Sequence, residues 1–99
     1  MSSSSANYLK PTHTEVTALT SSTAVLSANT ARRYALFVND SDTTMYLFLG
    51  GTAVVNKGIR LNANGGNYEM TTGRGNVYQG TVNVICSSTP KTLLVTEGI

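Results

Sequence analysis

YALFVNDSDTTMYLFLGG, residues 34–51, is the stretch that decides the fold class of this chain. Residues 34–39 and 43–49 are rich in aromatic, β-branched and other apolar side chains, which are typical of strands. The polar cluster at 39–42 is typical of a turn, and Gly50-Gly51 follows the second run. The stretch therefore predicts a β-hairpin.

Similar short runs, each bounded by Gly, Asn, Asp or Ser, fill the chain from Thr14 to Glu97. The expected strands are residues 14–20, 23–28, 34–39, 43–49, 59–61, 67–72, 81–87 and 92–97. No long stretch repeats its apolar residues with the helical period. Strands spaced by about 8 to 12 residues, with turn signals between them, are typical of sandwiches and barrels. We therefore expect an all-β fold, a single small antiparallel β-sandwich or barrel of about eight strands.

The domain organisation follows from length and local composition. At 99 residues the chain has the size of one domain. Residues 1–13 are polar and predict a flexible N-terminal arm, whereas residues 14–99 predict the sandwich. Tyr8 and Leu9 give the arm an apolar end that either stays unstructured or orders against a neighbouring subunit. His13, the one histidine, is expected in an exposed linker.

Composition argues for a surface that packs against other protein. Charged residues make up 12% of the chain, against roughly a quarter in typical domains, so Ser, Thr, Asn and Gly supply much of the polarity. Only Arg32-Arg33 pairs basic residues, so nucleic-acid binding is not expected. No apolar run reaches the length that spans a membrane. The first residues lack signal-peptide features, and synthesis in the cytoplasm is expected.

Catalytic, metal and cofactor sites are not expected. The chain has five acidic residues and one histidine, which is a poor supply for general acid–base chemistry. Asp40 and Asp42 alternate like calcium ligands, but the rest of a calcium loop is missing, so a turn cap is expected. Cys86 lies in an apolar run and is expected to be buried. Residues 73–80 lack the Gly-Lys-Ser/Thr ending of a phosphate loop and predict a flexible loop that presents Arg74 and Tyr78 to a partner protein or a sugar.

The predicted hairpin is apolar on both faces. One face is expected to carry Leu36, Val38, Met45, Leu47 and Leu49, and the other Phe37, Tyr46 and Phe48. Only one face of each sheet meets the core of a sandwich. The second face, with Phe37, Tyr46 and Phe48, is therefore either covered by loops or by the N-terminal arm, or it forms a subunit interface. The candidate contact residues are Tyr8, Leu9, Arg32, Arg33, Phe37, Tyr46, Phe48, Arg74 and Tyr78.

The segments TSSTAVLSAN (20–29), RRYALFVNDSD (32–42) and YLFLG (46–50) resemble small β-sandwich structural proteins of tailed bacteriophages. In these, a strand ending in Ala-Asn leads through Arg into an apolar strand and an Asn-rich turn. The resemblance spans roughly residues 14–97 and implies a building block present in many copies in a virion. It carries no catalytic residues.

Among virion roles, low charge, the doubly apolar hairpin and the arm favour a capsid decoration (cement) protein that binds across capsid subunit joints. Its expected partners are the major capsid protein or other virion proteins, together with further copies of itself, with a trimer favoured. The expected location is the virion, after synthesis in the host cytoplasm. Two alternatives stay open: a neck or tail assembly component, and a fibre-associated receptor- or glycan-binding module.

Overall fold

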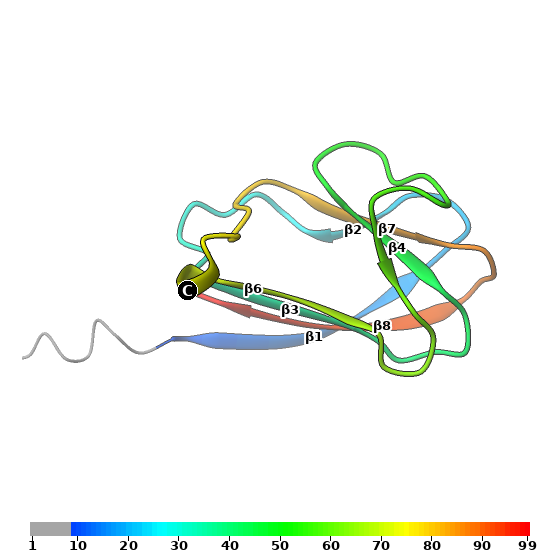
Figure 1. Cartoon of the computed structure of the whole chain (residues 1–99), viewed down its shortest axis with the longest axis horizontal. Helices are drawn as coiled ribbons and strands as arrows, with labels where there is room; N and C mark the ends of the chain where they lie inside the picture. Colours follow the sequence, from blue (N-terminus) through cyan, green and yellow to red (C-terminus); the bar gives the residue numbers. More distant parts are fainter. Residues whose placement is uncertain (1–8) are drawn as a thin grey trace, which may run out of the picture.

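Eight antiparallel strands form two four-stranded sheets that pack face to face (Figure 1). The computed structural model describes residues 9–99. The strands are β1 (Pro11–Ala18), β2 (Thr23–Leu26), β3 (Tyr34–Asn39), β4 (Met45–Leu49), β5 (Ile59–Leu61), β6 (Asn67–Thr71), β7 (Val82–Cys86) and β8 (Lys91–Gly98). The sequence-based prediction of an all-β sandwich is confirmed, and every expected strand is present.

The two sheets have different strand orders. Sheet A has the order β1-β8-β3-β6, and sheet B has the order β2-β7-β4-β5. Among the described strands, β4 and β5 are the only consecutive strands that pair with each other, whereas β3 pairs with β6 and β8, and β7 pairs with β2 and β4.

The predicted hairpin between residues 34–39 and 43–49 is wrong. β3 pairs with β6 and β8 in sheet A, whereas β4 pairs with β5 and β7 in sheet B. Asn39 explains why the chain crosses between the layers. Its buried side-chain amide donates to the carbonyl oxygens of Thr43 (2.8 Å) and Leu61 (3.0 Å), and Ser41 Oγ donates to its Oδ1 (2.7 Å). These bonds tie the end of β3 to sheet B, so the turn bridges the two layers.

The core lies between the sheets and alternates along the strands with the two-residue period of β structure. Its buried members are Ala18, Ala35, Phe37, Met45, Leu47, Leu61, Met70, Val82, Val84, Cys86, Leu93 and Val95. The prediction that Cys86 is buried is confirmed. Because β3 and β4 face each other across the core, their inward side chains pack together instead of extending one common sheet face.

β1 begins at Pro11, which is earlier than predicted, so His13 lies in a strand and not in a linker. Pro11 is opposite Gly98, and His13 is opposite Thr96 with 2.9 Å between His13 Nδ1 and Thr96 Oγ1. Lys10 and Ile99 continue the ladder with reciprocal backbone bonds. The end of the expected arm is therefore part of sheet A.

The loop expected at residues 73–76 contains a short 3₁₀ turn, η2 (Thr72–Arg74). Asn76 follows it and docks on the edge of β6. Its Oδ1 accepts from the backbone N–H of Thr71 (2.9 Å), and its Nδ2 donates to the carbonyl of Glu69 (3.0 Å). The side-chain amide thus takes the place of a neighbouring strand at this edge.

Candidate functional site

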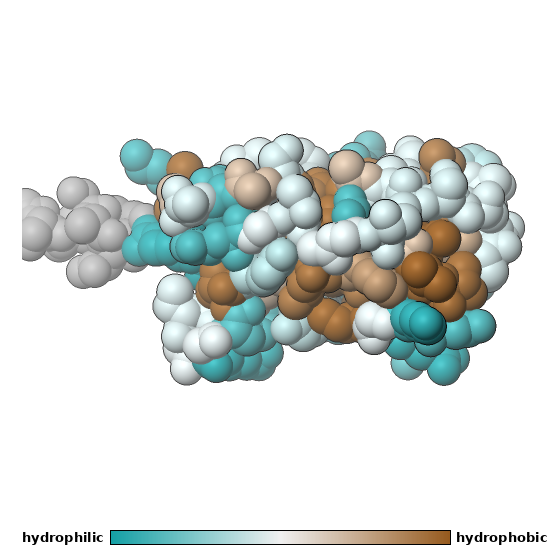
Figure 2. Space-filling view, turned by 90° about the horizontal axis from the view of Figure 1, so that it is seen from above, coloured by the Kyte–Doolittle hydropathy of each residue, from teal (hydrophilic) through white to brown (hydrophobic). Residues whose placement is uncertain are grey.

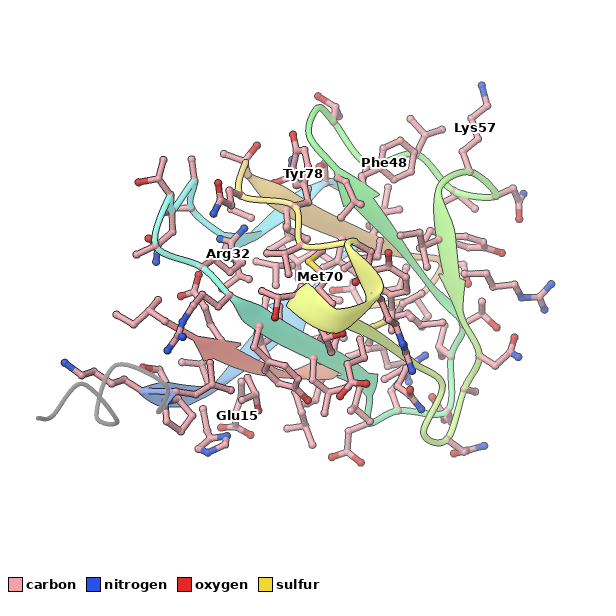
Figure 3. All side chains as sticks on the ribbon, turned by 60° about the vertical axis from the view of Figure 1, so that its left-hand side comes forward. Glu15, Arg32, Phe48, Lys57, Met70 and Tyr78 are labelled. Atoms are coloured by element: carbon pink, nitrogen blue, oxygen red, sulfur yellow. The ribbon has the colours of Figure 1, made fainter. Side chains whose placement is uncertain are left out.

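Arg32 is buried at one end of the sandwich, where it bonds to three separate segments. Its Nε donates to Glu97 Oε2 (2.7 Å), Nη1 to the carbonyls of Tyr78 (2.7 Å) and Gly80 (3.0 Å), and Nη2 to the carbonyl of Ser27 (2.6 Å). The guanidinium is fully enclosed, with 0% of the side chain exposed, whereas Glu97 retains 21%. In Figure 3 Arg32 lies in the interior of the fold below Tyr78.

The expectation that Arg32 is a surface contact residue is therefore wrong. A buried guanidinium needs a carboxylate and enough acceptors to replace water, and here all of these come from the chain itself. Arg32 joins the β2–β3 connection, the segment before β7 and the end of β8. The sequence offers one local signal for this role, the position of an arginine immediately before a buried strand.

Tyr78 is packed against the body of the protein and is not presented on an open loop. Its ring contacts the hydrophobic core. A Cβ built on either Gly50 or Gly80 would lie 2.5 Å from the Tyr78 hydroxyl oxygen, so glycine is needed at both positions to admit the ring. The phenol is thus held between two backbone segments, and Tyr78 is half-buried instead of projecting from a flexible loop, while its predicted contact with a sugar or a partner protein stays a prediction.

Phe37, Tyr46 and Phe48 do not share a face. Phe37 points into the core and is 0% exposed, because the inward set of β3 is Ala35, Phe37 and Asn39. Tyr46 and Phe48 lie on the outer face of sheet B and are half-buried. The predicted interface centred on these three residues is therefore wrong for Phe37, since alternation defines two sets of side chains but does not say which set points inward.

The connection at residues 50–58 covers the outer face of sheet B and arches over β4 and β7 (Figure 1). Tyr46 Oη donates to Asn56 Oδ1 (2.8 Å), and Asn83 Nδ2 donates to the carbonyl of Gly51. Apolar surface still remains on the side seen in Figure 2. Val54, which lies in this connection, is 45% exposed. The loop at residues 50–58 therefore covers part of this face, in line with the first of the two explanations left open by the sequence.

We expect Gly58→Ala to lower the free energy of unfolding by about 2–3 kcal/mol, since left-handed backbone strain adds to a collision. Gly58 has φ +83°, and an added Cβ would lie 2.5 Å from the Leu47 carbonyl oxygen and 2.7 Å from the Phe48 ring. Gly51→Ala is the matched control, because Gly51 has φ +78° with nothing within 4 Å. It should lose only about 1 kcal/mol. Urea unfolding measures both, and equal losses would contradict the close packing of Phe48 on Gly58.

The remaining predicted contact residues are dispersed. Arg33 is half-buried and donates from Nη2 to the carbonyl of Ile99 (3.2 Å). Arg74 is 64% exposed and lies 3.7 Å from Glu69 Oε1. Leu9 is 42% exposed and covers Gly98, where a built Cβ would lie 3.2 Å from its Cδ2. Tyr8 lies outside the described residues. The structure thus does not bring the eight described members of the predicted set into one site.

A different surface emerges on the outer face of sheet A, the side away from sheet B. A groove of about 620 Å³ is lined there by His13, Thr14, Glu15, Leu36, Val38, Leu94, Val95 and Thr96. We call it the sheet A groove. Leu94 opposes Val38 in the ladder, and Leu36 lies on the same face opposite Thr96, which gives the groove an apolar floor. Glu15 lies on this outer side of the sheet (Figure 3).

Polar side chains surround this floor. Glu15 is opposite Leu94 and His13 is opposite Thr96 on the β1 side. On the β6 side, Tyr34 Oη donates to Glu69 Oε2 (2.6 Å), and this hydrogen bond is the main reason that the pKa of Tyr34 is raised above its usual value. The tyrosine therefore stays protonated as a donor to the carboxylate. An apolar centre within a polar rim is the usual anatomy of a protein-binding surface.

Sequence reasoning placed Leu36 and Val38 on the face that packs in the core and Phe37 on the second face, so it missed this groove. The signal was present in β3, where Tyr34, Leu36 and Val38 alternate with Ala35, Phe37 and Asn39. Both sets are compatible with a core. The inward set became clear only from the partner strands, since β8 places Leu93 and Val95 inside and Leu94 outside.

The described residues hold no group of three or more His, Cys, Asp or Glu side chains suited to a metal ion. Asp42 bonds to Lys91 Nζ (2.7 Å), and that hydrogen bond is the main cause that lowers the pKa of its carboxyl. Within residues 9–99 no helix has the length and apolar character needed to cross a bilayer. Comparison with protein-family models, curated proteins and solved structures found no match to this chain.

Proposed function

We propose that this chain is a non-enzymatic structural protein of a virion, of the capsid decoration (cement) type, which binds across joints between capsid subunits and stabilises the shell. The observation that carries the proposal is the sheet A groove, whose apolar floor of Leu36, Val38 and Leu94 has no cover among the described residues. The resemblance to small β-sandwich proteins of tailed bacteriophages supports it independently.

The chemistry of the groove suits a capsid protein segment with apolar side chains. Burying apolar surface is favourable by about 25 cal/mol per Å², and the rim residues His13, Glu15 and Thr96 can orient the partner by hydrogen bonds. Standard protein interfaces bury about 800 Å² on each partner. The groove supplies the centre of such an interface, with the surrounding strands as its periphery.

Binding of many copies would strengthen attachment to the capsid even if each single contact is weak. The chain has few charges and a net charge of +2, so long-range repulsion between neighbouring copies is weak. Contacts that are linked through one assembly dissociate far less readily than single contacts. A homo-oligomer seated on several capsid subunits therefore stabilises the joint beyond the strength of one groove.

The role is tested on capsids. Capsids that lack this protein should assemble but lose resistance to heat or osmotic shock, and addition of the purified protein should restore it. Absence of binding to expanded capsids at micromolar concentration would overturn the cement role. Copy number separates the positions in the virion, since hundreds of copies indicate the shell, whereas six, twelve or a few tens indicate a neck or tail component.

We expect Leu94→Ser to weaken capsid binding by about tenfold, because part of a leucine side chain loses its apolar contact. Val54→Ser is the matched control. Leu94 is 38% exposed and Val54 is 45% exposed, but only Leu94 lines the sheet A groove. Quantitative binding to capsids, with circular dichroism to verify the fold, measures the effect. Equal losses for the two variants would contradict attachment through the groove.

A further inference from the structure

The four sheet edges of this sandwich differ in how well they are protected against pairing with another strand. β5 has 3 residues, and β2 has 4 residues with a register shift between Ala24 and Leu26. The edge of β6 is occupied by the Asn76 side chain. Short strands, irregularities and covering groups are the usual means by which β proteins prevent edge-to-edge association.

β1 carries none of these three protections. It has 8 residues and pairs only with β8 among the described strands. Lys10 and Ile99 exchange two backbone hydrogen bonds. Along an antiparallel ladder, such hydrogen-bonded residue pairs alternate with residue pairs that are not hydrogen-bonded to each other. Pro11, His13, Glu15 and Thr17 therefore direct their backbone groups away from β8. Proline fits this pattern, since its missing N–H falls on the open side.

We propose that β1 pairs antiparallel with β1 of a second copy about a two-fold axis at Thr14, which joins the two A sheets into one continuous sheet. In this register His13 exchanges backbone bonds with the partner's Glu15, and Thr17 donates to the carbonyl of the partner's Pro11. This pairing goes beyond the cement role and does not depend on it.

Charge and proline place the axis at Thr14 rather than at a neighbouring residue. An axis at Glu15 would set two carboxylates directly opposite each other, which destabilises a strand pair. An axis at His13 would set Pro11, which has no N–H, against the partner's Glu15 next to the centre of the ladder. With the axis at Thr14, the imidazole of His13 lies opposite a carboxylate and Pro11 lies toward the end.

Two exposed leucines support the same register. Leu9, which precedes β1 in the sequence, is 42% exposed, and Leu19, which follows β1, is 38% exposed. Because of these positions, the Thr14-centred register brings Leu9 of each copy toward the partner's Leu19, whose carbonyl accepts from the backbone N–H of Cys86. Pairing along β1 therefore covers two exposed apolar side chains from each copy while it satisfies the open backbone edge.

The pairing yields a two-fold dimer and not the trimer expected from the sequence. A three-fold ring through sheet A would need β1 of each copy to pair with β6 of the next. Asn76 already bonds to the backbone of Glu69 and Thr71 on that edge. The two edges of sheet A are thus unequal, and of these two described edges it is β1 that offers an open ladder to a second β1.

Cysteine cross-linking of the purified protein tests the pairing and its register. In the proposed dimer Thr14 faces the partner's Thr14 as a non-hydrogen-bonded pair, with Cα atoms about 4.5 Å apart, which lies within the range of a disulfide. Thr14→Cys should form a disulfide-linked dimer under mild oxidation. Thr52→Cys, an exposed loop position, is the control, and the buried native Cys86 should remain unlinked in the wild type.

The outcomes decide the inference. Rapid linkage of Thr14→Cys, with slower linkage of His13→Cys and Glu15→Cys, supports it. Linkage no faster than for Thr52→Cys, or fastest linkage at position 13 or 15, overturns it. Because capsids are absent, failure here leaves the cement role untouched, and failure of capsid binding leaves the dimer untouched.

A second variant tests the open edge without a cysteine. Glu15→Pro removes a backbone N–H that faces away from β8, so sheet A keeps its internal ladder. Analytical ultracentrifugation should show a dimer for the wild type and for Glu15→Ala, and a monomer for Glu15→Pro. A Glu15→Pro protein that stays dimeric, or a wild type that is monomeric at high micromolar concentration, overturns the inference.

Discussion

Replacement of Arg32 by methionine is expected to lower the free energy of unfolding by about 3–5 kcal/mol, the range seen when one partner of a buried ion pair is removed. Methionine fills much of the volume but provides no donors. Glu97 then loses its counter-charge, and the carbonyls of Ser27, Tyr78 and Gly80 lose the bonds that Arg32 supplies. Urea denaturation, followed by circular dichroism, measures the loss.

Arg74→Met is the matched control for this prediction. Arg74 is 64% exposed, and its closest carboxylate oxygen lies 3.7 Å away, so the substitution should change stability by less than about 0.5 kcal/mol. A loss below about 1 kcal/mol for Arg32→Met would mean that the buried network does not hold the three segments together. The comparison thus distinguishes the stability that comes from enclosing the guanidinium of Arg32 from the stability that an exposed ion pair provides.

The second large effect is expected for Phe37→Ala, which should lower the free energy of unfolding by about 3–5 kcal/mol. Phe37 is 0% exposed and packs between the sheets, so its removal leaves a cavity. Small domains are stable by only about 5–15 kcal/mol in total. The variant should therefore be unfolded at much lower urea concentration, irrespective of protein concentration.

Phe48→Ala is the control within the same residue type. Phe48 is half-buried on the outer face of sheet B, where it packs on Gly58, so its loss should be clearly smaller than that of Phe37. A larger effect for Phe48 than for Phe37 would contradict the assignment of the two rings to the surface and the core. The two variants together thus test which ring points into the core, a question that the alternation of side chains along a strand does not answer.

Strand positions were predictable because they depend on local properties. β-branched and aromatic runs, separated by Gly, Asn, Asp and Ser, disfavour helix and favour extended segments with turns between them. All eight strands of the structure fall within or close to the predicted ranges. Burial of Cys86 followed from the same local reasoning.

Strand partners were not predictable in this way. The residues at 39–44 have turn chemistry, but turn chemistry does not state whether the next strand stays in the same sheet. The side-chain amide of Asn39 holds this turn between the sheets, because it donates to the carbonyl of Leu61, which lies 22 positions further along the chain. Such a contact exists only once both sheets have formed, so no local pattern contains it.

The candidate site shows the same division. Arginine and tyrosine are common at protein interfaces, which favoured Arg32 and Tyr78 from composition alone. In the structure Arg32 is buried and bonded to other segments, and Tyr78 is half-buried with its hydroxyl packed between Gly50 and Gly80. The sheet A groove is formed by β1, β3 and β8 together, so the sequence of any one of these segments does not predict it.

The amino-acid sequence by itself determined that this protein is an all-β sandwich or barrel of about eight strands with few charges, because strand propensity, turn residues and charge content are properties of short segments. Only the tertiary structure decided which face of β3 is the core, which arginine is enclosed, and that β1 lies at an open edge. These depend on which strands become neighbours, and that choice is made by long-range packing and hydrogen bonds between residues far apart in the chain.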